Sequence, residues 1–228
     1  MCGRFTLRTP TNLLVQQFLL DSAPELPLRY NIAPTQSVAV VRESSDLPGR
    51  HLVMLQWGLI PSWAKDPKMG ARMINARGET VAEKPSFRAA FKRRRCLVLA
   101  DGYYEWKKGA AKGKKQPVYI TMADDRPFAF AGLWEYWEGS GEGPIESCTI
   151  ITTDSNDLTA DVHDRMPVIL HAEDYDLWLD RELEEREPLL PLLKPYPSDD
   201  MKVTLVSTHV NNARNDDPGC IESQRELF

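Results

Sequence analysis

The feature that most constrains the fold of this 228-residue chain is a succession of short apolar runs that are rich in β-branched and aromatic residues. Each run is bounded by Pro, Gly, Asp or Ser, which is the pattern of β-strands joined by turns. The runs read SVAVVRES, RHLVMLQWGLI, RRCLVLADGYYEW, PVYITMA, FAFAGLWEYW, SCTIITT, PVIL and KVTLVS. Because no regular helical crossovers separate them, the sequence predicts an α+β, β-rich fold whose mixed or antiparallel sheets curl into a barrel-like core.

Helices are expected to be few and short. The stretch TPTNLLVQQFLLDS predicts a helix with Thr9 as its N-cap and Pro10 in its first turn. Shorter helices are expected at 85–91 and 156–161, and one or two longer ones between residues 172 and 193. All of them should lie at the periphery of the β-structure.

The chain carries no signal for export or membrane insertion. Its start lacks a basic stretch followed by an apolar region, and no window approaches about 18 uninterrupted apolar residues. No Gly/Ser linker, repeat or low-complexity tract divides it, and no dimerisation motif stands out. We therefore expect a single domain over residues 1–228 that acts as a cytoplasmic monomer, associated with the nucleoid if the source is bacterial.

Charge is distributed unevenly along the chain. The formal net charge is −5, but residues 84–115 hold eleven Lys and Arg against two acids, and residues 171–200 hold ten acids against three basic residues. This polarity permits one basic face on an acidic protein, which is typical of a polyanion binder. The alternative is a solvated loop and a solvated helix face, and it is the better interpretation for the lysines of KKGAAKGKK. The acidic segment 171–200 contains no motif that indicates a function.

The four cysteines, at positions 2, 96, 148 and 220, form no CxxC pair. Their spacing argues against a zinc ribbon and against a thioredoxin-like site. Cys96 and Cys148 lie in apolar runs and are expected to be inert core residues. Because no His/Cys ligand cluster and no Gly-rich phosphate loop is recognisable, we expect neither a metal nor a cofactor.

Cys2 follows the initiator methionine directly, in the sequence MCGRF. If Met1 is removed, this residue carries a free α-amine and a thiol on adjacent carbons. Both groups ordinarily titrate within about two units of neutrality, so an appreciable share of each is nucleophilic near neutral pH. The alternative from these five residues alone is a small buried cysteine near the end of the chain.

Polar residues interrupt the strand pattern at several places. In RMINARGET, Asn75, Arg77 and Glu79 alternate with other residues and face one side if the segment is extended, so they form either a polar site or an exposed strand face. In ADGYYEWKK, Glu105 lies between Tyr104 and Trp106. Burial among these aromatic residues would raise its pKa and suit it to proton transfer, and the alternative is an edge residue paired with a lysine.

Two further segments carry candidate functional side chains. DVHDRMPVIL places His163, a natural general acid or base, and Arg165, a phosphate ligand, just before an apolar strand. A lone histidine is more often structural. QWGLIPSWAKDP contributes Trp57, which we interpret as core, and Trp63, which is either core or a stacking platform for unpaired bases.

Eight motifs occur in an order that resembles one protein family. They are MCGRF, RYNIAP, WGLIPSWA, INARGET, CLVLADGYYEWKK, FAFAGLWE, TIITT and HDRMPVIL, with a weaker echo in VSTHVNNARNDDP. Together they resemble the SRAP family of abasic-site processing proteins. The resemblance covers residues 2 to about 170 and implies the SRAP fold.

The resemblance also implies a chemistry for Cys2. Family members form a covalent link to an abasic site in single-stranded DNA through the cysteine that methionine removal exposes. The α-amine would condense with the sugar aldehyde, and the thiol would close a five-membered thiazolidine that shields the lesion from strand cleavage. Schiff-base chemistry of this kind is lyase-like, and the family is also described as having an autoproteolytic, peptidase-like activity. No metal or other cofactor is required.

Matching motif to motif, the resemblance implies roles for individual residues. Asn75 would orient the sugar or the Cys2 amine, Glu105 would move protons during imine formation and reversal, and His163 would assist opening of the sugar. The phosphates that flank the lesion would be bound by Arg4, Arg77 and Arg165. The bases would be contacted by Trp63 and Pro34, which would pack against them or wedge the strand.

Two other functions fit the beginning of the sequence. An N-terminal nucleophile hydrolase of the glutamine amidotransferase type would use the Cys2 thiolate to attack a side-chain amide, with its own α-amine as base. The downstream motifs favour a protein that acts on DNA over a hydrolase of this type. A non-covalent single-strand binding module would need Cys2 only as a structural residue, and its binding would fade with rising salt.

Overall fold

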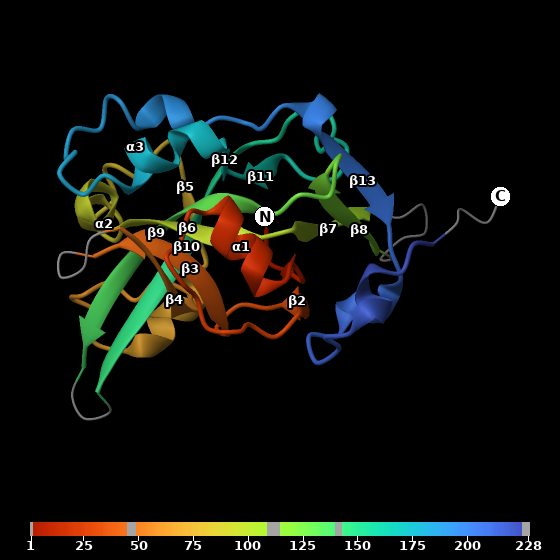
Figure 1. Cartoon of the computed structure of the whole chain (residues 1–228), viewed down its shortest axis with the longest axis horizontal. Helices are drawn as coiled ribbons and strands as arrows, with labels where there is room; N and C mark the ends of the chain where they lie inside the picture. The colour runs from red at the N-terminus through yellow and green to blue at the C-terminus, as the bar shows by residue number, and fades with distance from the viewer. Residues whose placement is uncertain (1, 45–48, 109–114, 140–142, 225–228) are drawn as a thin grey trace.

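The computed structural model of the chain describes residues 2–44, 49–108, 115–139 and 143–224 (Figure 1). Strands dominate these residues and form two sheets. The larger sheet has the order β11-β10-β4-β3-β6-β9-β12, with β5 paired to β10. Its strands are β3 (Ser37–Glu43), β4 (Arg50–Trp57), β5 (Asn75–Arg77), β6 (Arg95–Ala100), β9 (Phe128–Glu138), β10 (Pro144–Asp154), β11 (Arg165–Pro167) and β12 (Ile169–Leu170).

The larger sheet closes on itself. β10 pairs with β9 in antiparallel register and with β4 in parallel register, so the strands β10, β4, β3, β6 and β9 form a closed five-stranded barrel. Closure removes the free sheet edges that a flat sheet of these strands would leave. The predicted β-rich α+β fold with mixed sheets and a barrel-like core is confirmed.

The second sheet has the order β13-β8-β7-β1-β2 and is antiparallel. Its strands are β1 (Phe5–Leu7), β2 (Arg29–Ile32), β7 (Gly102–Lys108), β8 (Lys115–Met122) and β13 (Met201–Leu205). The sheets are connected through their cores, because Phe5 of β1 packs edge-on against Trp57, with ring centroids 5.1 Å apart, and against Phe130, at 5.7 Å. The start of the chain is therefore anchored inside the fold.

The buried interior matches the sequence interpretation of several residues. Trp57 is fully buried in the main core, and its indole Nε1 donates to the carbonyl of Ile74 at 2.9 Å. Cys96 and Cys148 are also fully buried, and burial raises the pKa of both thiols well above the usual range. Such thiols stay protonated near neutral pH, as expected of inert core residues.

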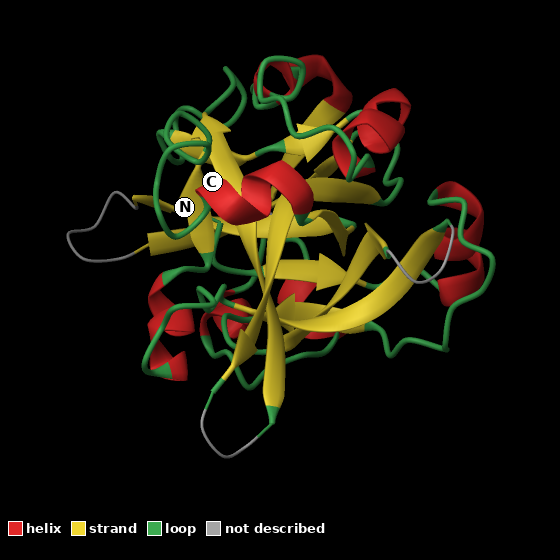
Figure 2. Cartoon of the chain, turned by 90° about the vertical axis from the view of Figure 1, so that its left-hand side faces the viewer, coloured by secondary structure: helices red, strands yellow, loops and turns green. Residues whose placement is uncertain are grey.

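Helices are short and lie around the strands (Figure 2). The α-helices are α1 (Thr11–Gln17), α2 (Arg88–Arg93) and α3 (Tyr175–Leu179), and the 3-10 helices are η1 (Pro67–Arg72), η2 (Ala172–Asp174), η3 (Leu190–Leu192), η4 (Ser198–Asp200), η5 (Thr208–Asn211) and η6 (Pro218–Ile221). The predicted helix at 156–161 is a series of turns, and the acidic region 172–193 forms only short helical pieces. No described helix is long and apolar enough to cross a membrane.

Two details of the sequence prediction are wrong for one reason, a buried carboxylate. The run RRCLVLADGYYEW is two strands in different sheets, β6 and β7, that meet at Asp101. The hydroxyl of Thr9 does not cap α1, because it donates to Asp101 Oδ2 at 2.9 Å. Asp101 is 1% exposed and also accepts from the Thr6 hydroxyl at 2.5 Å and from the backbone N–H of Arg8 at 2.6 Å.

The basic stretch 84–115 does not form one continuous basic face. Arg95 is 3% exposed, and its guanidinium donates only to backbone carbonyls, among them those of Phe91 and Trp178 at 2.7 and 2.6 Å. Burial lowers its pKa to about 10. Arg94 pairs with the buried Glu135 at 2.8 Å. These arginines are structural, and residues 109–114 of the lysine-rich loop lie outside the described residues.

Candidate active site

The start of the chain is positioned by strand pairing. β1 pairs with β7 in antiparallel register, with Phe5 opposite Tyr103, and the backbone N–H of Tyr104 donates to the carbonyl of Arg4 at 2.9 Å. Continuing this register places Gly3 opposite Glu105, so Cys2, the neighbour of Gly3, lies within electrostatic reach of the Glu105 carboxyl group. Cys2 is fully buried, and its thiol makes a long contact, at 3.9 Å, to the carbonyl of Arg4.

Asn75 holds Cys2 by its backbone. The Asn75 side-chain Nδ2 donates to the carbonyl oxygen of Cys2 at 2.8 Å. Asn75 begins β5, which pairs in parallel with β10 so that Asn75 lies opposite Ile150 while Ala76, the next residue, is buried. The amide oxygen Oδ1 of Asn75 is also buried and has no hydrogen-bond partner within the described part of the chain. It is thus an acceptor available to a ligand or to an amine.

Glu105 is a buried carboxyl group near the thiol. Its side chain is on β7 and the residue is 5% exposed. Burial raises the pKa of Glu105. His163 acts in the opposite direction and lowers that pKa, so the histidine lies within electrostatic reach of the Glu105 carboxyl group. Burial and then the charge of Glu105 raise the pKa of the Cys2 thiol far above its usual range. The two groups therefore form a pair in which the thiol is protonated and a carboxylate with raised basicity is close by.

Tyr103 is a member of the site that the sequence analysis did not single out. It is fully buried, and its hydroxyl has no hydrogen-bond partner among the described residues. Burial raises its pKa strongly, and the neighbouring Cys2 and Glu105 raise it further. Nothing in the pattern ADGYYEW separates this tyrosine from an ordinary core residue, and only the unpaired hydroxyl beside Cys2 reveals it.

His163 lies at the edge of this group and is half-buried. Its Nδ1 accepts the backbone N–H of Arg165 at 3.0 Å and lies 2.8 Å from the carboxylate of Asp164. A surface hollow of about 460 Å³ opens here, lined by Arg77, Asp154, His163, Asp164 and Arg165. The predicted histidine and two of the predicted phosphate ligands therefore share one hollow.

The two arginines of this hollow differ in exposure and in ion pairing. Arg77 is exposed at the end of β5. Arg165 forms ion pairs with Glu79 and with Asp154, the latter at 2.9 Å, and donates to the carbonyl of Thr152 at 2.7 Å. Glu79 lies in the turn after β5 and is bound to Arg165 rather than continuing the row of Asn75 and Arg77.

Arg4 turns away from Cys2 toward the C-terminal segment. Its Nη1 donates to the side chain of Asn31 at 2.8 Å and to the carbonyl of Val210 at 3.0 Å. Its guanidinium also lies 5.9 Å from the centre of the Trp106 ring. A second hollow, of about 480 Å³, is lined by Arg4, Trp106, Lys115 and Asn211.

The two remaining sequence candidates lie in loops. Trp63 follows β4 and is 56% exposed, which decides against its being a core residue. Pro34 lies in the loop between β2 and β3 and is half-buried. The structure thus brings Cys2, Asn75 and Glu105 together, places His163 beside Arg77 and Arg165, and leaves Trp63 available on the surface.

Comparison with known proteins identifies the family. A family model described as SOS response associated peptidase (SRAP) matches residues 1–213. The chain belongs to the SRAP family. This finding confirms the resemblance that the eight motifs indicated.

Relatives of this SRAP protein occur in bacteria and vertebrates. It is 45% identical over 226 residues to the abasic site processing protein YoqW of Bacillus subtilis, an alignment that covers 98% of this chain and 100% of that protein. It is 32% identical over 268 residues to the abasic site processing protein HMCES of Mus musculus, covering 97% of this chain and 75% of that protein.

A solved structure shares the fold of this SRAP protein. A crystal structure of a protein from Bacteroides thetaiotaomicron superposes with a TM-score of 0.84 at 26% sequence identity, covering 98% of this chain and all of that one. The barrel and the strands that position Cys2, Asn75 and Glu105 therefore belong to an arrangement that recurs at low sequence identity.

Proposed function

We propose that this SRAP protein processes abasic sites in single-stranded DNA by forming a covalent crosslink through Cys2 once Met1 has been removed. The observation that carries the proposal is the grouping at the chain start: Asn75 holds the Cys2 backbone at 2.8 Å, and the buried Glu105 lies within electrostatic reach of the thiol. The names of the relatives support abasic sites as the substrate.

The first step is condensation of the Cys2 amine with the aldehyde of the ring-opened sugar. The nitrogen attacks the carbonyl carbon, and loss of one water gives an imine. Both stages need proton transfers, which Glu105 is suited to perform because burial raises its pKa toward the working pH. His163, at the mouth of the hollow, assists opening of the sugar to the aldehyde.

The second step is ring closure by the thiol. Its sulfur adds to the imine carbon, and its proton ends on the nitrogen, so a thiazolidine forms without further loss of atoms. Because the thiol is protonated in this site, the step requires a base, and Glu105 accepts the proton and returns it to the nitrogen. The closed ring lacks the iminium that drives β-elimination, so the lesion is shielded from strand cleavage.

The DNA backbone is proposed to follow the hollow beside His163. Arg77 contacts a phosphate directly, since its side chain is exposed. Arg165 exchanges its partner Glu79 for a phosphate, which replaces one charge-assisted pair with another. Arg4 holds a phosphate on the other side of the lesion, while Trp63 and Pro34 pack against or wedge between neighbouring bases.

The same constellation is proposed to release Met1. Water would add to the Met1 carbonyl carbon and the Cys2 nitrogen would leave as a free amine, which is a peptidase reaction in keeping with the description of the family. Asn75 donates to the Cys2 carbonyl, so its role in this step is to fix the position of the chain.

The crosslink is tested on a denaturing gel. The full-length protein is mixed with single-stranded DNA that carries one abasic site and, separately, with intact DNA of the same sequence. We expect a denaturant-resistant shifted band only with the abasic strand. Cys2→Ala should give no band, and Glu173→Gln, a control at an exposed residue, should give the wild-type yield. A missing band from protein whose mass shows Met1 to be absent would refute the proposal, and glutamine hydrolysis would then be assayed.

A further inference from the structure

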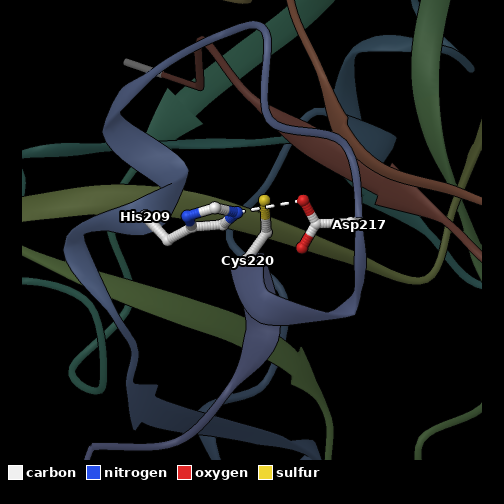
Figure 3. Close-up of side chains that lie close together, drawn as sticks. All are labelled: His209, Asp217 and Cys220. Atoms are coloured by element: carbon white, nitrogen blue, oxygen red, sulfur yellow. Dashed lines mark hydrogen bonds and ion pairs between the residues drawn. The ribbon is translucent and has the colours of Figure 1, made fainter.

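A second cluster of reactive side chains lies in the C-terminal segment, outside the site around Cys2. His209 belongs to η5, Cys220 belongs to η6, and Asp217 immediately precedes η6. One ligand atom of each lies within 4.8 Å of the other two, and Figure 3 shows the three side chains pointing toward one another. The sequence analysis recognised no His/Cys ligand cluster, because it considered sequence spacing and not this grouping in space.

The three side chains present suitable donor atoms. His209 Nε2 lies 3.0 Å from Asp217 Oδ2, and the Cys220 thiol makes a bond to the carbonyl of Asn215 at 3.4 Å. The other carboxylate oxygen of Asp217 accepts the backbone N–H of Gly219 at 2.9 Å and so fixes the orientation of the carboxylate. Oδ2 of that carboxylate is thus held facing the imidazole.

We propose that His209, Asp217 and Cys220 bind one Zn²⁺ through Nε2, Oδ2 and Sγ, with water as the fourth ligand. A nitrogen, an oxygen and a sulfur ligand together match zinc better than magnesium or calcium, which prefer oxygen ligands throughout. Tetrahedral zinc places its ligand atoms roughly 3.3–3.6 Å apart. The sulfur therefore needs to approach the other two atoms by roughly 1.5 Å at most, while Nε2 and Oδ2, which are 3.0 Å apart, need to separate slightly. The thiol loses its proton, and the site becomes electrically neutral.

Zinc binding requires one local rearrangement. The Asn215 Nδ2 lies 3.1 Å from His209 Nδ1 and donates to the His209 carbonyl at 2.8 Å, so the ring proton is on Nε2 and faces Asp217. The metal replaces that proton, and the neutral ring then carries its proton on Nδ1. Rotation of the Asn215 amide lets its oxygen accept this proton, which is the usual arrangement behind a zinc-bound histidine.

The bound metal would brace one wall of the hollow that contains Arg4. It connects η5 to η6, and η5 supplies the Val210 carbonyl that accepts from Arg4 and the Asn211 side chain that accepts from Trp106 Nε1 at 2.7 Å. The Asn215 carbonyl, which faces the Cys220 thiol, also accepts from Asn31 at 2.7 Å. Zinc would therefore stabilise the supports of Arg4 without taking part in the chemistry of Cys2.

The test uses Co²⁺ as a spectroscopic probe and Zn²⁺ as its competitor, on the full-length protein. We expect one Co²⁺ per chain, with the visible absorption of a tetrahedral ion and a thiolate-to-cobalt charge-transfer band, both abolished by Zn²⁺. Cys220→Ser should lose the charge-transfer band, and His209→Gln and Asp217→Asn should each weaken Zn²⁺ binding at least tenfold. Cys2→Ala and Asp199→Asn serve as controls that keep the band and the affinity.

The proposal is overturned by a charge-transfer band that persists in Cys220→Ser, or by Zn²⁺ affinities that are equal in the wild type and in His209→Gln. Because Cys220 is buried, its replacement could unfold the segment. The variants of His209 and Asp217, which are both exposed, then decide the question, with circular dichroism confirming their fold. Metal binding is measured without DNA, so the result is independent of the crosslink.

Discussion

Two buried carboxylates, Asp101 just before β7 and Glu105 within it, lie four residues apart and have different surroundings. Asp101 accepts hydrogen bonds from the hydroxyls of Thr6 and Thr9 and from the backbone N–H of Arg8. These three bonds, at 2.5–2.9 Å, connect the N-terminal segment to the junction of the two sheets. Asp101 is thus surrounded by donors that compensate for its burial.

Glu105 lies in the opposite kind of environment. Burial raises its pKa, which means that the surroundings do not fully compensate for its charge. Two buried polar atoms nearby, Asn75 Oδ1 and the Tyr103 hydroxyl, have no partner within the described residues. The comparison teaches that the structure surrounds Asp101 with hydrogen-bond donors, whereas the Asn75 Oδ1 atom and the Tyr103 hydroxyl near Cys2 are left without a partner, so that a substrate can pair with them.

The largest effect is expected from removing the satisfied carboxylate. Asp101→Ala leaves three donors without their acceptor, and each unsatisfied donor costs about 1–3 kcal/mol. Allowing for partial relaxation, we expect the free energy of unfolding to fall by about 4 kcal/mol, measured by urea denaturation. Asp199→Ala, on the surface, should stay within about 0.5 kcal/mol of the wild type. A loss below about 1 kcal/mol for Asp101→Ala would contradict the role assigned to this network.

Replacing Glu105, the carboxyl group with the raised pKa, should slow the reaction without lowering the stability. Glu105→Gln removes the proton carrier, so the rate of crosslink formation should fall roughly 10²–10⁴-fold. The same change removes the buried charge that the raised pKa disfavours, so the free energy of unfolding above that pKa should rise. Single-turnover gels and urea denaturation measure the two effects, with Glu173→Gln as control. If Glu105→Gln were less stable than the wild type, the contrast drawn between Asp101 and Glu105 would be wrong.

The pH dependence of stability sharpens this prediction. The folded-state pKa of Glu105 is raised, so its protonated form is favoured by folding, and the stability this provides is lost as pH rises through the raised pKa. Glu105→Gln does not titrate there. The difference in unfolding free energy between Glu105→Gln and the wild type should therefore be smallest near pH ~4 and reach its full size at higher pH. Urea denaturation at several pH values across this range measures the difference. If the difference did not change with pH, Glu105 would be excluded as the titrating group.

Tyr103→Phe tests the unpaired hydroxyl and should have a smaller effect. Removing a buried hydroxyl that has no partner should raise the free energy of unfolding by about 1 kcal/mol. If that hydroxyl donates to the bound sugar, as its place beside Cys2 indicates, the crosslinking rate should fall severalfold in the same variant. Both are measured as for Glu105→Gln, with Tyr136→Phe, an exposed tyrosine, as control. A destabilised Tyr103→Phe would show that the hydroxyl has a partner after all.

The sequence predicts the strands of this protein well because their signals are local. The runs that become β3, β4, β8, β9 and β10 alternate or are continuously apolar between turn residues, and the structure forms strands there. The break at Asp101 was missed because it depends on donors from Thr6, Arg8 and Thr9, more than 90 residues earlier in the chain. No local pattern reports such a distant contact.

In the candidate site, too, the residues with a local sequence signal were predicted and those that depend on distant contacts were missed. Cys2, Asn75 and Glu105 were found because each lies in a motif of the family, and the structure brings them together. Tyr103 was missed because its function depends on what its hydroxyl lacks, which only packing reveals. The ion pairs that neutralise Arg165 were missed because Glu79 lies 86 residues away in the sequence, where it was interpreted as part of a row with Asn75 and Arg77, and Asp154 belongs to another strand.

The smallest effect is expected at Thr9. The sequence and the structure assign different roles to its hydroxyl. As an N-cap of α1, Thr9 would stabilise the helix independently of Asp101. In the structure its hydroxyl bonds to Asp101 instead, so Thr9→Ala should cost about 1 kcal/mol in the wild type and almost nothing when combined with Asp101→Ala. Urea denaturation of the two single variants and the double variant measures the coupling. Additive losses would restore the capping interpretation, whereas strong coupling would show that Thr9 acts on the N-terminal segment through the same carboxylate that positions β1, and hence Cys2.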